Sequence, residues 1–288
     1  MPEGDTVWRT AHRLDRALAG EPLVLCDLRF PAVATVDLTG ATTLEVVSRG
    51  KHILQRLDSG LTLHSHLRME GQWRVQRPEA TSGWLRRDDL RAAVGTTTWT
   101  ALGLRLGMLD LVATSEEHLL VGHLGPDVLG PDWDPVAAAA NLATSPEPIA
   151  AALLDQRNLA GVGTMWAAES LFLERLHPWT PAGDVGPAAL AALVARAHRL
   201  LDAARHQAVP SSTGSTRRGE GHHVHGRSGL PCRRCGGTVR VAMAGGPNRE
   251  RTIFYCPTCQ GGLAPTDDGR PQRPLGASRG RATGYRRD

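Results

Sequence analysis

The sequence predicts an α+β protein, with a strand-rich N-terminal half behind a leading helix, a helical C-terminal half and a zinc ribbon near the C-terminus. Alternating apolar and polar residues over much of residues 22–121 predict strands, and an alanine-rich composition from residue 135 predicts helices. Two Cys-x2-Cys pairs follow at the spacing of a zinc ribbon. A chain of 288 residues is long enough for two domains with cores of their own.

A helix is expected over residues 5–19, near the start of a first domain that is predicted to span residues 1–122. Asp5 or Thr6 can cap the N-terminus of this helix. Its buried face is predicted from one apolar stripe at helical spacing, formed by Val7, Ala11, Leu14 and Leu18.

The rest of this domain is expected to consist of strands over residues 22–30, 42–48, 52–57, 61–67 and 105–113. Asp58-Ser59-Gly60 is interpreted as a hairpin turn. Antiparallel strands of this kind assemble into a sandwich or a flattened barrel. Core or edge packing is the expected role of Trp73, Trp84 and Trp99.

An interdomain linker is predicted at residues 123–134, where two Gly-Pro-Asp turns interrupt the periodicity. The second domain is predicted to span residues 135–229, with helices over residues 135–143, 148–154, 164–175 and 187–206. Residues 155–163 are predicted to form a tight turn between two of these helices, and residues 209–229, rich in Ser, Gly, Arg and His, to form a mobile loop.

Four cysteines indicate a metal site: Cys232, Cys235, Cys256 and Cys259. Two knuckles at this spacing favour a structural zinc ion held by four thiolates, in a ribbon over residues 230–262. Disulfides or redox pairs are the alternatives. The fifth cysteine, Cys26, is interpreted as a core thiol. Residues 263–288 are rich in Gly, Pro and Arg and are predicted to be a disordered basic tail.

The charge is mildly basic, with a formal net charge of +4 and a pI of about 9.1. Much of this charge lies in the tail, so a nucleic-acid footprint on the folded part must be a local patch. No apolar run reaches the roughly 18 residues of a membrane span, and no signal peptide is recognisable. We therefore expect a cytoplasmic protein with no membrane partner.

The N-terminus, Met1-Pro2-Glu3-Gly4-Asp5, has the composition of a reactive site. Residue 2 is small, so we expect Met1 to be removed, which leaves Pro2 as a free secondary amine. Such an amine titrates near ~8 and can attack a sugar aldehyde carbon to form a Schiff base. Glu3 can shuttle the protons that this chemistry needs. The alternative is a disordered terminus.

Three further features can contact phosphate groups. Lys51 is the single lysine among 33 basic residues, and only lysine offers a compact, titratable charge. The alternative for Lys51 is codon bias. Arg251 precedes Cys256 on the ribbon hairpin and can clamp a phosphate, or it lies at a solvated tip. Gly161 and Gly163 allow close backbone approach, either by a phosphate or by a packed segment.

A set of ordered motifs between Pro2 and Gly262 resembles the formamidopyrimidine-DNA glycosylase/endonuclease VIII family of base-excision repair enzymes. The motifs are PEG at the start, SRGKHIL around Lys51, LTLHSHLRMEGQWRV, LLDQRNLAGVGTMWAAESLF, GRSGLPC, and RTIFYCPTCQ at the end of the ribbon. PEG, RGK and LTLxSH with GxWRV look closer to the endonuclease VIII branch.

The resemblance implies an N-terminal β-sandwich that carries the catalytic proline and a C-terminal helix–two-turn–helix domain with a zinc ribbon, with DNA in the groove between them. It implies that Pro2 is the nucleophile and Glu3 the acid/base. Lys51 and Arg251 match the family's catalytic-site lysine and arginine that hold phosphates. Met69 matches the side chain that the family inserts into the void left by a flipped base.

The sequence departs from the family pattern at three places. Gly163-Thr164 stands where the family commonly has Gly-Asn, and we expect these two residues to contact DNA in its place. His225 stands where many members have Tyr, and the loop Ser211–Gly221 is short for purine recognition. These departures bear on damage preference and DNA affinity.

The expected function is therefore that of a bifunctional DNA glycosylase/AP lyase that binds damaged double-stranded DNA as a monomer, associated with the nucleoid when bound. It would remove oxidised bases, pyrimidines first, through a Schiff base at Pro2 and β,δ-elimination. One alternative is a purine-type enzyme (8-oxoguanine or formamidopyrimidine) on the same fold. The other is a non-catalytic paralogue that binds damaged DNA.

Overall fold

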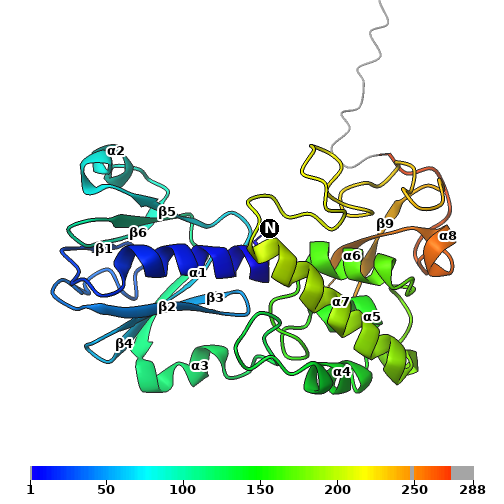
Figure 1. The fold of residues 1–288 in the computed structure, drawn as a ribbon, viewed down its shortest axis with the longest axis horizontal. Coiled ribbons are helices and arrows are strands. Elements are labelled where there is room, and N and C mark those ends of the chain that lie inside the picture. Colours follow the sequence, from blue (N-terminus) through cyan, green and yellow to red (C-terminus); the bar gives the residue numbers. More distant parts are fainter. Residues whose placement is uncertain (1, 247–249, 274–288) are drawn as a thin grey trace, which may run out of the picture.

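The computed structural model describes residues 2–246 and 250–273. Figure 1 shows a strand-rich part and a helical part side by side, with the N-terminus between them. The leading helix α1 (Gly4–Leu18) runs from this junction across the strand-rich part. The α+β class that the sequence predicts is confirmed.

The strand-rich part contains two four-stranded antiparallel sheets, with strand orders β1-β6-β7-β5 and β2-β3-β4-β8. The strands are β1 (Leu25–Leu28), β2 (Thr43–Arg49), β3 (His52–Leu57), β4 (Leu61–His66), β5 (Gln72–Gln76), β6 (Leu90–Gly95), β7 (Thr100–Leu104) and β8 (Met108–Ala113). Short helices follow β5 and β8: α2 (Ser82–Leu85) and α3 (His118–Val121).

Helix α1 closes the core of the strand-rich part. Its predicted stripe is buried, because Val7, Ala11, Leu14 and Leu18 are at most 3% exposed and share one apolar cluster with residues from both sheets. Packing of an amphipathic helix over both sheets explains why the N-terminal residues are held in a fixed place.

The predicted strand over residues 105–113 is wrong at its start, because β7 ends at Leu104 and β8 begins at Met108. Arg105, in the turn between them, has a left-handed φ of 49° that a strand does not allow. Strands β5, β6 and β7 were not predicted.

The helical part consists of α4 (Pro135–Ala143), α5 (Ile149–Leu154), α6 (Thr164–Leu173) and α7 (Pro187–Arg205). Pro135 and Pro187 occupy the first turns of α4 and α7, where the missing N–H is harmless. Helix α6 lies in the centre and is buried along most of its length, including Trp166 and Phe172, which are 0% exposed.

The ribbon is a two-stranded antiparallel sheet of β9 (Arg240–Ala244) and β10 (Arg251–Tyr255), followed by α8 (Pro257–Gln260). The predicted disordered tail is wrong for its first residues after 263. Ala264 is buried, and Asp267 accepts hydrogen bonds from Arg240 and Tyr255, so this segment packs on the ribbon. The rest of the predicted tail, residues 274–288, lies outside the described residues.

Among the helices of residues 2–246 and 250–273, none has the combination of length and apolar character that crossing a bilayer needs.

Candidate DNA-processing site

The carboxylate of Glu3 lies on the N-terminus of α6. Its two oxygens accept hydrogen bonds from the backbone N–H groups of Gly163 (2.9 Å), Met165 (2.8 Å) and Trp166 (3.2 Å). The first N–H groups of a helix have no partner within the helix, and the helix dipole favours an anion there. Glu3 therefore caps a helix of the other part of the molecule, 160 residues further along the chain.

Glycines allow this close approach. The N–H of Gly4 donates to the carbonyl of Gly161 at 2.9 Å, and Gly161 has a φ of +101° that favours glycine. A Cβ atom on Gly163 would lie 2.4 Å from Cδ of Glu3. The sequence left open whether a phosphate or a packed segment approaches this turn; in the structure the N-terminal segment does.

Asp5 makes a second contact with α6. It is 0% exposed, and its Oδ1 accepts from Nε1 of Trp166 at 3.0 Å. Burial raises the pKa of Asp5, although the Trp166 hydrogen bond and the nearby Arg9 oppose this shift.

Lys51 follows Gly50 in the tight turn between β2 and β3. Its Nζ donates to the carbonyl oxygen of Val162 at 2.7 Å, and Gln156 donates to the same oxygen at 2.9 Å. Lys51 therefore reaches the turn that Glu3 caps, so the structure brings these two predicted site residues to the same place.

The two charged groups influence each other. Burial raises the pKa of Glu3, and the positive charge of Lys51 opposes this shift. Burial lowers the pKa of Lys51, Glu3 opposes the shift, and the charge of Arg251 adds to it. The two shifts bring the pKa values of the carboxyl and the amine closer together, as suits groups that take up and release protons during a reaction.

Asp127 fixes the Lys51 turn and was not singled out from the sequence. Its Oδ2 accepts from the N–H of Gly50 at 2.8 Å, and its Oδ1 accepts from the N–H of Leu129 at 3.1 Å. The side chain is buried, which raises its pKa. Its only signal in the sequence was the Gly-Pro-Asp turn, which is equally typical of a linker without a functional residue.

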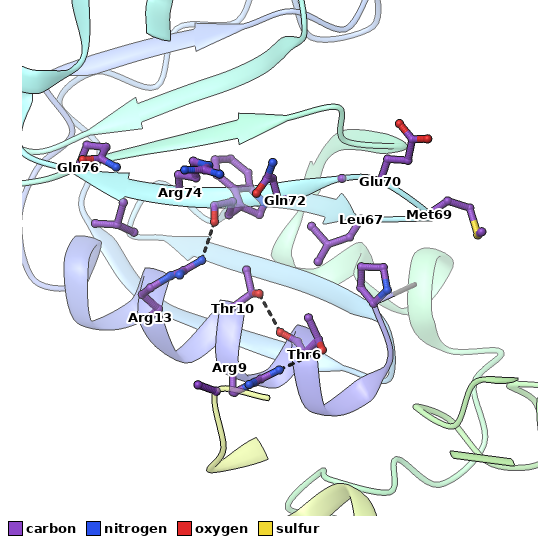
Figure 2. Close-up of a pocket in the computed structure, with 15 residues that line it drawn as sticks. Thr6, Arg9, Thr10, Arg13, Leu67, Met69, Glu70, Gln72, Arg74 and Gln76 are labelled. Carbon is purple, nitrogen blue, oxygen red and sulfur yellow. Dashed lines mark hydrogen bonds between the residues drawn. The ribbon is translucent and has the colours of Figure 1, made fainter. Parts of the chain in front are cut away.

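A cavity of about 770 Å³ opens beside Pro2. Its lining combines the exposed side of α1 with the loop that joins β4 to β5 and with β5 itself (Figure 2). Met69 stands at one end of this cavity and is 64% exposed, which is unusual for a large apolar side chain. Pro2 and Met69 therefore line the same cavity.

Arg251 begins β10 and is exposed. It lines a second cavity of about 390 Å³, together with His123, Gln156 and Arg157. Gln156 shares the Val162 carbonyl with Lys51 and lines the same cavity as Arg251, so the ribbon hairpin and the Lys51 turn lie near one another.

A chain of histidines continues from Lys51 and was also missed in the sequence. Nδ1 of His52 lies 2.8 Å from Nε2 of His64, whose Nδ1 lies 2.9 Å from Asp110. Burial and neighbouring cationic groups lower the pKa of His52 to about 3 and that of His66 to about 4, so both rings are neutral at pH 7. Alternate residues of β3, β4 and β8 bring this cluster together on one sheet face.

Glu169 of α6 organises the loop after α7. It is 0% exposed and accepts hydrogen bonds from the N–H groups of His223, Val224 and His225, and from the hydroxyl of Ser212. The loop predicted to be mobile is thus tied to α6 at both ends. Burial lowers the pKa of His225 to about 4.

Thr164 is the first residue of α6 and follows Gly163, the N-cap. The N–H of Gly163 already donates to Glu3, so this N–H can donate to a DNA phosphate only if Glu3 moves away. The contact of Gly163 and Thr164 with DNA stays a prediction.

The four cysteines of the ribbon converge. Their Sγ atoms all lie within 4.8 Å of one another, and the pairs Cys232–Cys259 and Cys235–Cys256 are 3.9 and 3.5 Å apart. These separations exceed a disulfide bond of about 2.05 Å. Four thiolates gathered around a common centre are the donor set of a tetrahedral metal site.

Family models match both parts of the chain. The formamidopyrimidine-DNA glycosylase N-terminal domain matches residues 1–107, and the H2TH domain of the same enzymes matches residues 124–215. The chain belongs to the formamidopyrimidine-DNA glycosylase/endonuclease VIII family. The resemblance drawn from the motifs is confirmed.

Relatives in this family are similar over their whole length. A probable endonuclease 8 2 of Streptomyces coelicolor is 50% identical over 271 residues, covering 94% of this chain and 98% of the relative. A protein of Mycolicibacterium smegmatis named DNA-(apurinic or apyrimidinic site) lyase Nei2 is 42% identical and covers 90% of this chain and 99% of the relative. These names support the endonuclease VIII-like branch.

The fold is also that of a solved family member. The Lactococcus lactis formamidopyrimidine-DNA glycosylase, non-covalently bound to DNA with an AP site, has a TM-score of 0.76 and 23% identity. It covers 90% of this chain and 99% of that chain.

Proposed function

We propose that this chain is a bifunctional DNA glycosylase/AP lyase of base-excision repair. The observation that carries the proposal is the meeting of Pro2, Glu3 and Lys51 at the junction of the two parts, in a member of this family. The substrate is damaged double-stranded DNA, bound by a monomer.

Pro2 is the proposed nucleophile. After removal of Met1, which lies outside the described residues, its secondary amine attacks C1′ of the damaged nucleotide and displaces the base. The sugar ring opens, and an imine forms between the proline nitrogen and C1′. The imine withdraws electrons from C2′, so loss of a C2′ proton expels the 3′ phosphate, and a second elimination expels the 5′ phosphate.

Glu3 is the proposed acid/base for these steps. Burial raises its pKa, which makes proton uptake easier, while the three backbone N–H groups of α6 keep the carboxylate in one orientation. A proton on Glu3 can pass to the ring oxygen of the sugar as the ring opens.

Lys51 and Arg251 are the proposed phosphate contacts on either side of the lesion. Both are cationic, and they approach the turn before α6 from different parts of the molecule. Met69, exposed beside the Pro2 cavity, is proposed to fill the gap that the flipped nucleotide leaves in the duplex. Gly163 and Thr164 are proposed to lie against the DNA backbone.

Zinc is the metal proposed for the ribbon. Four thiolates leave no open position, so the ion would hold β9, β10 and α8 together and take no part in the reaction. Cys232, Cys235, Cys256 and Cys259 would be its ligands, one ion per chain.

Oxidised pyrimidines are the proposed first choice of substrate, because the relatives above 40% identity carry endonuclease 8-type names. The purine-type alternative is testable on the same protein. A panel of duplexes with 5-hydroxyuracil, 8-oxoguanine and formamidopyrimidine lesions separates the two.

Borohydride trapping tests the proposal. The protein is mixed with a duplex that carries an abasic site, or separately 5-hydroxyuracil, and the imine is reduced to a stable crosslink. The chain offers two aliphatic amines, the terminal amine and Lys51, so peptide mapping identifies the attacking group. We expect the crosslink at Pro2, and none when Met1 is retained. No crosslink with either duplex, from protein that binds DNA, would favour the non-catalytic paralogue.

A further inference from the structure

A third cavity, of about 760 Å³, runs along the outer face of α1, and we call it the α1 groove. Cationic side chains dominate its lining, and no acidic residue is among the lining residues. Arg9, Arg13 and Arg16 follow one another along α1, and Arg205 approaches from the C-terminal end of α7.

Two of these four arginines have no counter-charge in the part of the chain that the structure describes. Among the described residues, Arg13 and Arg16 have no carboxylate partner, whereas Arg9 lies 3.6 Å from Asp5 and Arg205 lies 2.7 Å from Asp202. Burial, with repulsion from Arg74 and Arg9, lowers the pKa of Arg13. An anion in the groove would relieve this repulsion.

Two tryptophans that line the groove, Trp8 and Trp99, each lie under a guanidinium; Arg205 lines the groove, and Arg77 lies outside its lining. The guanidinium of Arg205 lies 4.8 Å from the ring centre of Trp8, and that of Arg77 lies 3.8 Å from Trp99. Guanidinium groups and aromatic rings are the side chains on which unpaired nucleic-acid bases stack. Bases offer their faces in this way only where the strand is unpaired, so the groove suits a single strand better than a duplex or an acidic polypeptide.

The groove continues into the cavity beside Pro2. The two spaces share Arg9, Arg13 and Val75. Figure 2 shows Arg9 and Arg13 projecting from α1 along the edge of that cavity. A DNA strand that runs from Pro2 along α1 would therefore pass from arginines of the first cavity to those of the α1 groove without leaving the cationic surface.

We propose that the α1 groove is a second nucleic-acid-binding site, which holds an unpaired DNA strand extending from the site at Pro2. Phosphates contact Arg13, Arg16 and Arg205, and bases stack on the guanidinium faces. The inference rests on the proposed function only in that the same DNA occupies both spaces.

The test compares a lesion-free single-stranded oligonucleotide with a blunt duplex, each bound to the full chain over a series of salt concentrations and followed by fluorescence anisotropy. The variants are Arg16→Gln alone and Arg16→Gln with Arg205→Gln. The matched control is Arg86→Gln with Arg199→Gln, which removes two exposed arginines outside both cavities.

Each phosphate contact to a single strand contributes about 0.7 to the slope of log affinity against log salt. We therefore expect the slope for the single strand to fall by about 0.7 in the single variant and about 1.4 in the double variant. The slope for the duplex, and both slopes of the control, should stay unchanged.

Equal slopes in the double variant and the control would overturn the proposal, as would equal losses for strand and duplex. Polyglutamate serves as a competitor: if its binding falls in the double variant while strand binding does not, the groove serves an acidic polypeptide. Trapping by the wild-type protein is scored separately. If the wild-type protein forms no crosslink but the double variant shows the strand-specific change in slope, the proposed lyase chemistry is refuted and the proposed strand-binding groove is supported.

Discussion

The substitution Gly163→Ala tests the contact between Glu3 and α6. The added Cβ would lie 2.4 Å from Cδ and 2.7 Å from Oε1 of Glu3, closer than heavy atoms can approach, so the carboxylate must leave. Its departure removes all three hydrogen bonds from the helix N–H groups. The backbone of Gly163 has a φ of −124°, which alanine adopts without strain, so the effect comes from the clash alone.

The magnitude follows from those three bonds. Loss of a helix cap costs about 1 kcal/mol, and hydrogen bonds to a charged group contribute roughly 1.5–3 kcal/mol each. Water solvates the released carboxylate and removes the penalty for its burial, so we expect a net loss of about 2–4 kcal/mol. For a chain of this size this corresponds to a fall in Tm of roughly 5–12 °C.

Gly186→Ala is the matched control. Gly186 is the N-cap of α7, as Gly163 is of α6, but a Cβ there meets no heavy atom within 4 Å. Thermal unfolding of both variants, with trapping on an abasic duplex, gives the comparison. We expect Gly163→Ala to lose stability and most of its crosslink yield, and Gly186→Ala to keep both. Two indistinguishable variants would refute the role assigned to the Glu3 contact.

Three further results are expected. Asp5→Asn keeps the acceptor for Trp166 but removes a buried charge. Because the folded-state pKa of Asp5 is raised, its ionised form lowers the stability of the wild type only above the unfolded-state pKa. The variant should therefore have a higher Tm than the wild type at pH 7 and lose this gain by pH 3.5, and a gain independent of pH would contradict the reasoning. Cys256→Ser should lower bound zinc, measured by mass spectrometry, from one ion per chain and lower the Tm, while Cys26→Ser should leave both unchanged; unaltered zinc in the former would exclude the four-thiolate site. Lys51→Gln should weaken binding to an abasic-site duplex at least tenfold, because it removes a phosphate contact, and wild-type affinity would argue against that role.

The sequence predicted those elements whose signals are local. The stripe from Val7 to Leu18 repeats at the helical period, and the cysteine spacing is set by one metal centre. Strands β6 and β7 gave no such signal. All five residues of β7 and all but one of β6 are buried, on both faces of each strand, so the alternation that marks a half-exposed strand is absent.

The candidate site was predicted only in part for a related reason. Pro2, Glu3 and Lys51 stood out by position or by rarity. Asp127 and the partners of Glu3 act through contacts that join residues 77 and 160 positions apart, and single-sequence patterns hold no information about such pairs. Glu3 as a cap for α6 is a property of the assembled fold.

The way in which the two parts share one site limits how the protein can be divided. The pairs Glu3–Gly163, Asp5–Trp166, Gly50–Asp127 and Lys51–Val162 each join a residue of the strand-rich part to one beyond it. A chimaera that crosses over between residues 51 and 127 inherits the two members of every pair from different parents. Recombination between family members would therefore preserve these contacts only where one parent supplies the side chains of Glu3, Asp5 and Lys51 and the other supplies Trp166, Asp127 and a backbone that can receive them, so the two domains are not interchangeable parts despite their separate cores.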